Sequence, residues 1–360
     1  MKKTQLLVVL IVLMLACFPQ ACKKKETTVD KTQVLNLIPS GATVILSVDT
    51  ERLFNLPALA GVLDEAFSSM DKGLEEIGAG DFFEATGIDL RKDLKRITNA
   101  VYSEPGQGEN ILILAEMEAD SERIVSFLQE QGALEKDSEY RQTTVWLIKE
   151  KEADFELMEK ARQDMRLAFI EPKLMAIGNA WLINQVLDLQ AGAGESIQAA
   201  PGFKESLAGL KSDGILWLTL PQIPKGADQD EGQGFLPFMP QALTDAQGIQ
   251  GYLDFRNKSY EFALHLLSSN ADANKELVEM LNGFKAMAVM GLAQDKEDGP
   301  LWKELLDRLQ LEAKADWVSL SGVFPETLMN ALAEKARSKA SEVLQGEPEP
   351  NDVESQYQDI

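Results

Sequence analysis

The sequence predicts an α+β fold made of two similar halves, each an antiparallel sheet with helices packed on one face. Three observations support this prediction. Short strand-like stretches alternate with helical stretches along the chain, and neither type dominates. Several strand-like stretches are joined by brief polar turns, which is typical of antiparallel hairpins. Finally, the order strand, turn, strand, helix occurs twice, with a period of about 150 residues.

The expected N-terminal half covers residues 36–197. Its strands are rich in β-branched and aromatic residues and are expected at 42–49, 99–104, 110–117, 143–148, 166–171 and 173–178. Its helices show apolar residues at helical spacing and are expected near 56–70, 82–97 with a glycine turn at Gly87, 122–132 and 179–190. Asp120 and Ser121 stand where a helix N-cap belongs, which fixes the start of the third helix.

The expected C-terminal half covers residues 198–338. Short helices are expected at 200–210 and 270–283, and strands at 214–221 and on both sides of a turn at Asn257-Lys258 within 250–269. The last segment, 316–336, reads as a strand followed by a helix, with Pro325 near the helix start.

The two halves share a recurring pattern. Residues 99–132 and 250–283 both run strand, polar turn, strand, Ala-Asp, helix and glycine. In this alignment Ala119-Asp120 corresponds to Ala271-Asp272, and Gly132 corresponds to Gly283. The repeat is divergent, and it predicts two copies of one α+β unit.

Three stretches carry a resemblance to a known family: IPSGATVILSVDTERL, GIDLRKDL, and KLMAIGNAWLINQVLDLQ followed by APGFKESLAGLKSDGILWLTL. Together they resemble the bacterial extracytoplasmic proteins of the domain-of-unknown-function family 3352, over most of residues 36–338. The resemblance implies an exported, often lipid-anchored or membrane-anchored protein with a repeated α+β fold. It brings no catalytic residues, because none is assigned in that family.

The N-terminus predicts a bacterial lipoprotein signal over residues 1–16, or 1–21. A basic Met1-Lys2-Lys3 start precedes the eleven apolar residues 6–16, a run shorter than the roughly 20 residues of a membrane span. A cysteine that follows a small residue just past such a run is the residue that is acylated. An ordinary signal peptide or an uncleaved anchor is the alternative, and a Cys17–Cys22 disulfide would close only a very short loop.

The choice of acylated cysteine stays open between Cys17 and Cys22, the two cysteines of the chain. Cys17 adjoins the apolar run directly, and this position favours it. Cys22 is preceded by Pro19-Gln20-Ala21 and is followed at once by a polar tether. Neither cysteine has an aspartate two positions after it, and in enteric bacteria this absence argues against retention in the inner membrane. We therefore expect an extracytoplasmic protein on the periplasmic face, anchored through its N-terminal lipid to the outer membrane.

Both ends of the mature chain are expected to be flexible. Residues 17–35 read as a tether, and residues 339–360 as an acidic disordered tail. The chain carries 35 basic and 58 acidic residues, and loss of Lys2 and Lys3 with the signal makes the mature net charge −25. Such a charge repels nucleic acid, so we expect no nucleic-acid partner.

The sequence contains no catalytic motif that we recognise. Its one histidine, His265, lies in the apolar stretch FALHLL, where we expect a partly buried or edge-facing strand residue and not a catalytic base. The loop GADQDEGQG contains Asp228, Asp230 and Glu231 but lacks EF-hand spacing, so we interpret it as a solvated acidic loop. We therefore expect no metal, no cofactor and no catalytic residue.

One apolar loop stands out as a candidate interaction site. It is GFLPFMPQAL, in which Phe235, Leu236, Phe238 and Met239 lie between two prolines. The alternative is that this loop folds back onto the core. The sequence favours a lipid-anchored envelope protein that binds or scaffolds envelope partners and is not an enzyme. Two further hypotheses stay open, a carboxylate-dependent envelope hydrolase and a carrier of an apolar ligand.

Overall fold

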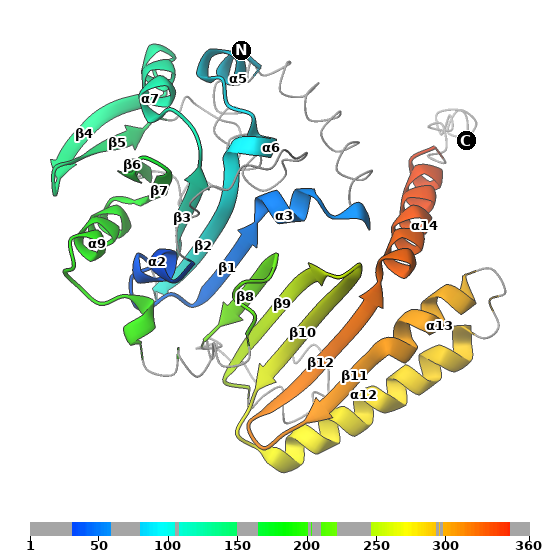
Figure 1. The fold of residues 1–360 in the computed structure, drawn as a ribbon. Helices are drawn as coiled ribbons and strands as arrows, with labels where there is room; N and C mark the ends of the chain where they lie inside the picture. The colour runs from blue at the N-terminus through cyan, green and yellow to red at the C-terminus, as the bar shows by residue number, and fades with distance from the viewer. Residues whose placement is uncertain are drawn as a thin grey trace, which may run out of the picture.

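The computed structural model describes residues 31–58, 80–104, 108–149, 165–200, 203, 210–221, 246–292, 295 and 298–345. These residues form one sheet of 12 strands in the order β11-β12-β10-β9-β8-β1-β2-β3-β7-β6-β5-β4 (Figure 1). Every neighbouring pair is antiparallel. The mixed α and β character and the antiparallel pairing predicted from the sequence are therefore confirmed.

The described elements follow each other along the chain in this order. The strands are β1 (Val44–Asp49), β2 (Leu94–Glu104), β3 (Gly108–Met117), β4 (Leu134–Tyr140), β5 (Thr143–Ile148), β6 (Met165–Glu171), β7 (Leu174–Asn179), β8 (Leu216–Leu220), β9 (Gly248–Arg256), β10 (Ser259–Leu267), β11 (Leu309–Ala313) and β12 (Trp317–Pro325). The helices are α2 (Lys31–Asn36), α3 (Thr50–Phe54), α5 (Gly80–Thr86), α6 (Leu90–Asp93), α7 (Ser121–Glu130), α9 (Ala180–Gln190), the 3-10 turn η2 (Ile197–Ala199), α12 (Ala271–Leu292), α13 (Gly299–Arg308) and α14 (Glu326–Gln345).

A single sheet replaces the two separate sheets that the sequence predicted. Strands β1 and β8 pair side by side, with Ile45 opposite Thr219 and Val48 opposite Leu216. This pairing joins the N-terminal strands to the C-terminal strands at the centre of the sheet (Figure 1). Each half alone would expose an unpaired edge at this point, and the pairing satisfies both edges.

The N-terminal part of the sheet carries helices on both faces, which corrects the prediction of helices on one face. Leu112 and Leu114 of β3 pack in a core with α9 and α2. Their neighbours Ile113 and Ala115 pack in a second core with α5 and α7. Because side chains alternate between faces along a strand, the continuous apolar run of β3 buries both faces.

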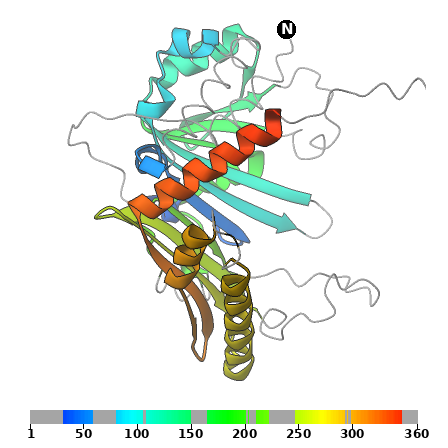
Figure 2. The ribbon, with the colours of Figure 1, turned by 90° about the vertical axis from the view of Figure 1, so that its right-hand side faces the viewer.

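The C-terminal part of the sheet is covered mainly on one face, as predicted. Phe324 and Tyr260 pack there against Leu328 and Leu332 of α14 and against α13. Val318 packs against Ala273 and Leu277 of α12. Figures 1 and 2 both place α12 and α13 beside these strands.

Several predicted boundaries need correction. Residues 31–35 of the expected tether belong to α2, in which Val34 and Leu35 are buried. Helix α14 continues to Gln345, into the expected disordered tail. The helix expected over 82–97 is α5, a turn at Gly87 with φ 70, the short α6 and the start of β2. Helix α12 continues nine residues past Gly283, its expected end.

Candidate functional site

A buried row of charged side chains crosses the centre of the sheet, where β1, β2 and β3 lie side by side. Arg96 of β2 lies between Asp49 of β1 and Glu116 of β3, its partners in the strand register. Its Nη2 lies 3.1 Å from Asp49 Oδ2, and its Nε lies 3.4 Å from Glu116 Oε1. The second oxygen of Asp49 accepts the backbone N–H of Arg52 and so caps α3.

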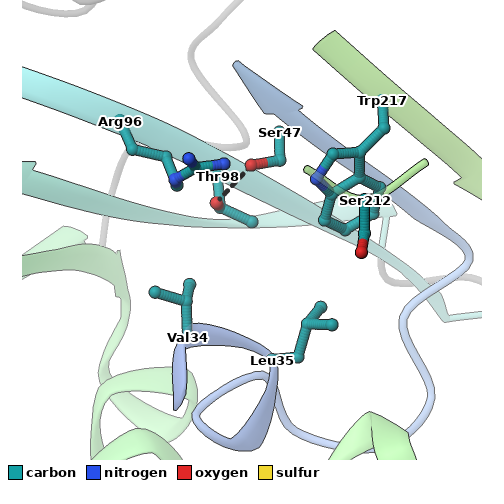
Figure 3. A pocket seen from close by; sticks show the side chains of 7 residues that line it. All are labelled: Val34, Leu35, Ser47, Arg96, Thr98, Ser212 and Trp217. Atoms are coloured by element: carbon teal, nitrogen blue, oxygen red, sulfur yellow. Dashed lines mark hydrogen bonds between the residues drawn. The ribbon is translucent and has the colours of Figure 1, made fainter. Parts of the chain in front are cut away.

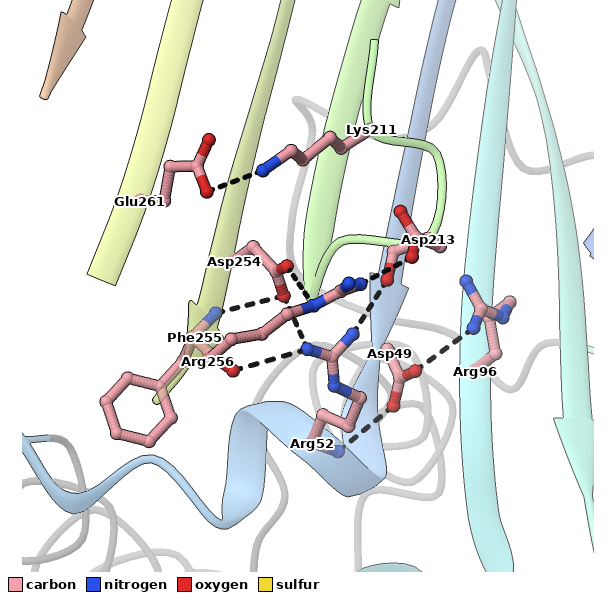
Figure 4. A network of polar contacts seen from close by, with 9 residues as sticks. All are labelled: Asp49, Arg52, Arg96, Lys211, Asp213, Asp254, Phe255, Arg256 and Glu261. Atoms are coloured by element: carbon pink, nitrogen blue, oxygen red, sulfur yellow. Dashed lines mark hydrogen bonds and ion pairs between the residues drawn. The ribbon is translucent and has the colours of Figure 1, made fainter. Parts of the chain in front are cut away.

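A second ion-pair cluster lies beside this row and connects the two parts of the chain (Figure 4). Asp254 of β9 is 1% exposed and pairs with two arginines, Arg52 of α3 and Arg256 of β9. Arg52 Nη1 also donates to the Asp213 carbonyl oxygen at 2.7 Å, and Arg256 pairs with the Asp213 carboxylate. The cluster therefore ties α3 to the loop before β8 and to β9.

The third polar group in this region is formed by Lys211, Tyr252 and Glu261. Lys211 pairs with Glu261, and the Tyr252 hydroxyl donates to Glu261 Oε1 at 2.9 Å. The ammonium of Lys211 lowers the pKa of Glu261. Burial, with the neighbouring Glu261 as a smaller cause, raises the pKa of Tyr252 above its ordinary value.

A cavity lies between this polar region and α2 (Figure 3). Its volume is about 50 Å³, and it is lined by Val34, Leu35, Ser47, Arg96, Thr98, Ser212 and Trp217. The Ser47 and Thr98 hydroxyls are hydrogen-bonded to each other at 3.0 Å. The volume suits one or two water molecules, each of which takes about 30 Å³, and it is far below the roughly 300 Å³ of the smallest cofactor sites.

The chemistry of the central region is that of a structural ion-pair network. Paired-carboxylate hydrolysis requires two acids that face a common cleft and a substrate. Here the carboxylates of Asp49, Glu116, Asp213, Asp254 and Glu261 each lie beside an arginine or lysine. The network connects α3, β1, β2 and β3 to β9, β10 and the loop before β8, so its evident effect is to hold the two parts of the sheet together.

His265 is half-buried in β10, as the sequence predicted. Its ring stacks on Trp317 with centroids 4.9 Å apart, and its Nδ1 lies 3.2 Å from Gln250 Nε2. Burial, followed by repulsion from Lys314, lowers the pKa of His265. The contact with Trp317 could not be predicted from the sequence, because it depends on the pairing of β10 with β12, which no local pattern shows.

The most unusual surface feature is the second half of α12. Three large apolar side chains project there into solvent: Phe284 is 53% exposed, Met287 55% and Met290 66%. Ala286 and Ala288 on the same stretch are also exposed. The sequence predicts the end of this helix at Gly283, so this surface was not predicted. The sequence feature that marks this surface is the apolar stretch GFKAMAVMGL at residues 283–292, which contains no acid.

The site residues predicted from the sequence lie outside the described residues. These are the lipidation candidates Cys17 and Cys22, the loop residues Phe235, Leu236, Phe238 and Met239, and the acidic loop residues Asp228, Asp230 and Glu231. In the described ranges, no helix has the length and apolar content needed to cross a bilayer. Within the same ranges, no group of three or more His, Cys, Asp or Glu residues is placed to hold a metal ion.

Comparison with known proteins gave no family. No family model and no curated protein matches the chain. The chain is similar to solved structures of TP0453. For crystal form III the TM-score is 0.42 at 11% identity, over 87% of this chain and 100% of that chain. For crystal form IV it is 0.42 at 12% identity, over 84% and 95%. These TM-scores support no conclusion about function, and the resemblance to family 3352 stays a prediction.

Proposed function

We propose that this chain is a lipid-anchored protein of the cell envelope that acts by binding and not by catalysis. The observation that carries the proposal is the exposed apolar half of α12, with Phe284, Met287 and Met290. Apolar side chains that cluster in solvent lose the free energy of burial, and large exposed clusters mark interaction sites. A binding surface accounts for residues of this kind at these positions.

Two other functions are less well supported by the described residues. A carboxylate-dependent hydrolase needs free acids in a cleft, whereas the central acids are bound to arginines and a lysine. A carrier of an apolar ligand needs an internal cavity of several hundred Å³. The central cavity of about 50 Å³ has an arginine in its wall.

We also infer that the two parts of the sheet are similar halves. Outward from the centre, one side runs β1, β2, β3, β7, β6 and the other runs β8, β9, β10, β12, β11. In both, the second and third strands form a hairpin and the third is followed by a helix, α7 or α12. The hairpin β4–β5 is then an addition to the first half.

The anchor is the part of the proposal that a direct experiment tests. Cells expressing the full chain are grown with a palmitate analogue, and the protein is then isolated and assayed for label. We expect label on the wild-type protein. Because the anchor is a single acylated cysteine, either Cys17→Ala or Cys22→Ala should remove it, and the affected variant identifies the site.

The double variant Cys17→Ala/Cys22→Ala serves as the control for other acylation sites. Label that survives in the double variant, or wild-type protein without label, would contradict the anchor. Isolation of the labelled protein from solubilised envelopes, followed by identification of the co-purifying proteins, then asks whether it has envelope partners.

A further inference from the structure

The exposed apolar surface of the second half of α12 is a candidate binding surface. We propose that it docks on a phospholipid bilayer, with Phe284, Met287 and Met290 entering the interfacial region. This inference rests on the proposed envelope function, since it gives the anchored protein a second contact with the membrane. It does not depend on which cysteine carries the lipid.

The exposed side of α12 changes character half-way along the helix. In its first half the exposed side chains are polar: Asp272, Lys275, Glu276, Glu279 and Asn282. In its second half they are apolar: Phe284, Ala286, Met287, Ala288 and Met290. A helix on the surface of a soluble domain normally keeps polar residues outward along its whole length. The first half obeys this rule and the second half breaks it, so the second half is built for an apolar environment.

The charge distribution on α12 fits a lipid surface. The chain as a whole carries a net charge of −23, which works against approach to anionic headgroups. The last acid of α12 is Glu279, and residues 280–292 contain no acid. The single cation in that stretch, Lys285, donates its Nζ to the Leu309 carbonyl at 2.6 Å. The apolar half of the helix therefore presents no acid to the bilayer, and its one cation is hydrogen-bonded to the backbone of β11.

The next helix, α13, also exposes an aromatic residue. Trp302 lies in the first turns of α13, the helix that packs beside α12, and it is 41% exposed. Tryptophan is enriched at membrane–water interfaces, because its ring is apolar and its N–H can bond to water or headgroups. Helices with Phe, Trp and other apolar residues on one face lie in this interface with that face buried by about 5–10 Å.

The size of the patch favours a lipid surface over a second copy of the chain. About half of each large side chain is exposed, so the three residues and Trp302 together offer about 400 Å². A stable protein–protein interface takes about 800 Å² from each partner. A bilayer requires no matching surface of that size, because it accepts any apolar side chain that reaches it.

The proposed anchor makes the contact sterically feasible. Between Cys22 and Lys31, where the described chain begins, there are eight residues, which extend to about 30 Å. From Cys17 the extended length is about 45 Å. A folded body of this size is about 50 Å across. An anchored body therefore stays within about its own width of the bilayer, close enough for α12 to meet the surface.

Site-specific photo-crosslinking tests the proposal. Benzoylphenylalanine replaces Met287 in the full acylated protein, which is reconstituted in phosphatidylcholine vesicles and irradiated. We expect a lipid adduct on the protein. The matched control places the same probe at Glu276, an exposed position in the polar half of the same helix, where we expect no adduct. Phe284→Glu, combined with the probe at 287, should abolish the adduct, because it introduces a charge into the inserting face.

Each other outcome overturns the proposal. A probe at 287 that crosslinks to a second copy or to another protein assigns the patch to protein binding. Equal lipid adducts at 276 and 287, or no adduct at either, show that the patch does not insert. Both probe positions are exposed, and circular dichroism verifies that the variants are folded. Palmitate labelling that persists while the 287 adduct fails would refute docking and leave the proposed anchor intact. A lipid adduct at position 287 on protein that takes up no palmitate label would refute the anchor and leave the docking proposal intact.

Discussion

At the scale of single residues, Asp254 makes the strongest energetic contribution that the structure allows us to predict. It is 1% exposed and neutralises Arg52 and Arg256. Asp254→Asn should lower the free energy of unfolding by about 2–4 kcal/mol, because it removes the buried carboxylate that both arginines contact. Arg256 keeps its ion pair with Asp213, and Arg52 keeps its hydrogen bond to the Asp213 carbonyl. The partial exposure of both arginines keeps the loss below that of a fully buried pair. Urea unfolding measures it.

The matched control for this variant is Asp272→Asn on α12. Asp272 is 91% exposed, and among the described residues its ion-pair partner is Lys275, three residues along the same helix. We therefore expect a change below about 0.5 kcal/mol. Equal effects of the two substitutions would show that the central ion pairs do not hold the two parts of the sheet together.

His265 gives a prediction about pH. Its pKa lies below the ordinary 6.5 because of burial, with Lys314 as the next cause. The folded state therefore favours the neutral ring, and the stability that this provides is complete above pH 6.5. It is lost as the pH falls through the lowered pKa. As the chain has one histidine, its NMR titration is read without overlap. Lys314→Met should raise the midpoint, and a wild-type midpoint at or above 6.5 would contradict the assignment.

At the scale of elements, a strand or helix is predictable from the sequence where the pattern that marks it is local. The hairpin of β9 and β10 was predicted because a two-residue polar turn separates two strand-like stretches. The turn residues Asn257 and Lys258 have positive φ values of 52° and 59°, a conformation that asparagine favours. Strand β4 was missed because its residues LEKDSEY are almost all exposed, so no alternating pattern marks it. Its charges suit the edge of the sheet, where they discourage pairing with other chains.

Helix α12 shows a different limit. Gly283 is its predicted end, because glycine costs about 1 kcal/mol in a helix interior and commonly ends helices. The structure continues the helix to Leu292. The following residues FKAMAVM include good helix formers, which offset that cost. The apolar composition of residues 283–292 is therefore visible in the sequence, whereas their place on an exposed helix is not.

At the scale of the whole molecule, the central region depended on pairings that no local pattern contains. Ile45 and Thr219 lie opposite each other although 174 positions separate them in the chain. The ion pair of Arg52 and Asp254 spans 202 positions. The sequence predicted most of the individual strands, but the joining of β1 to β8, and with it the network and the cavity, required the structure.

The central claim is that the anchored body also holds to the membrane through α12. A protease recognition sequence inserted after Lys25 lets the body be cut from its lipid on phosphatidylcholine vesicles. After cleavage, we predict that the wild-type body sediments with the vesicles. The variant Phe284→Glu/Met287→Glu should be released, because two charges prevent insertion of the helix face. Release of both proteins, or retention of both, would contradict the claim.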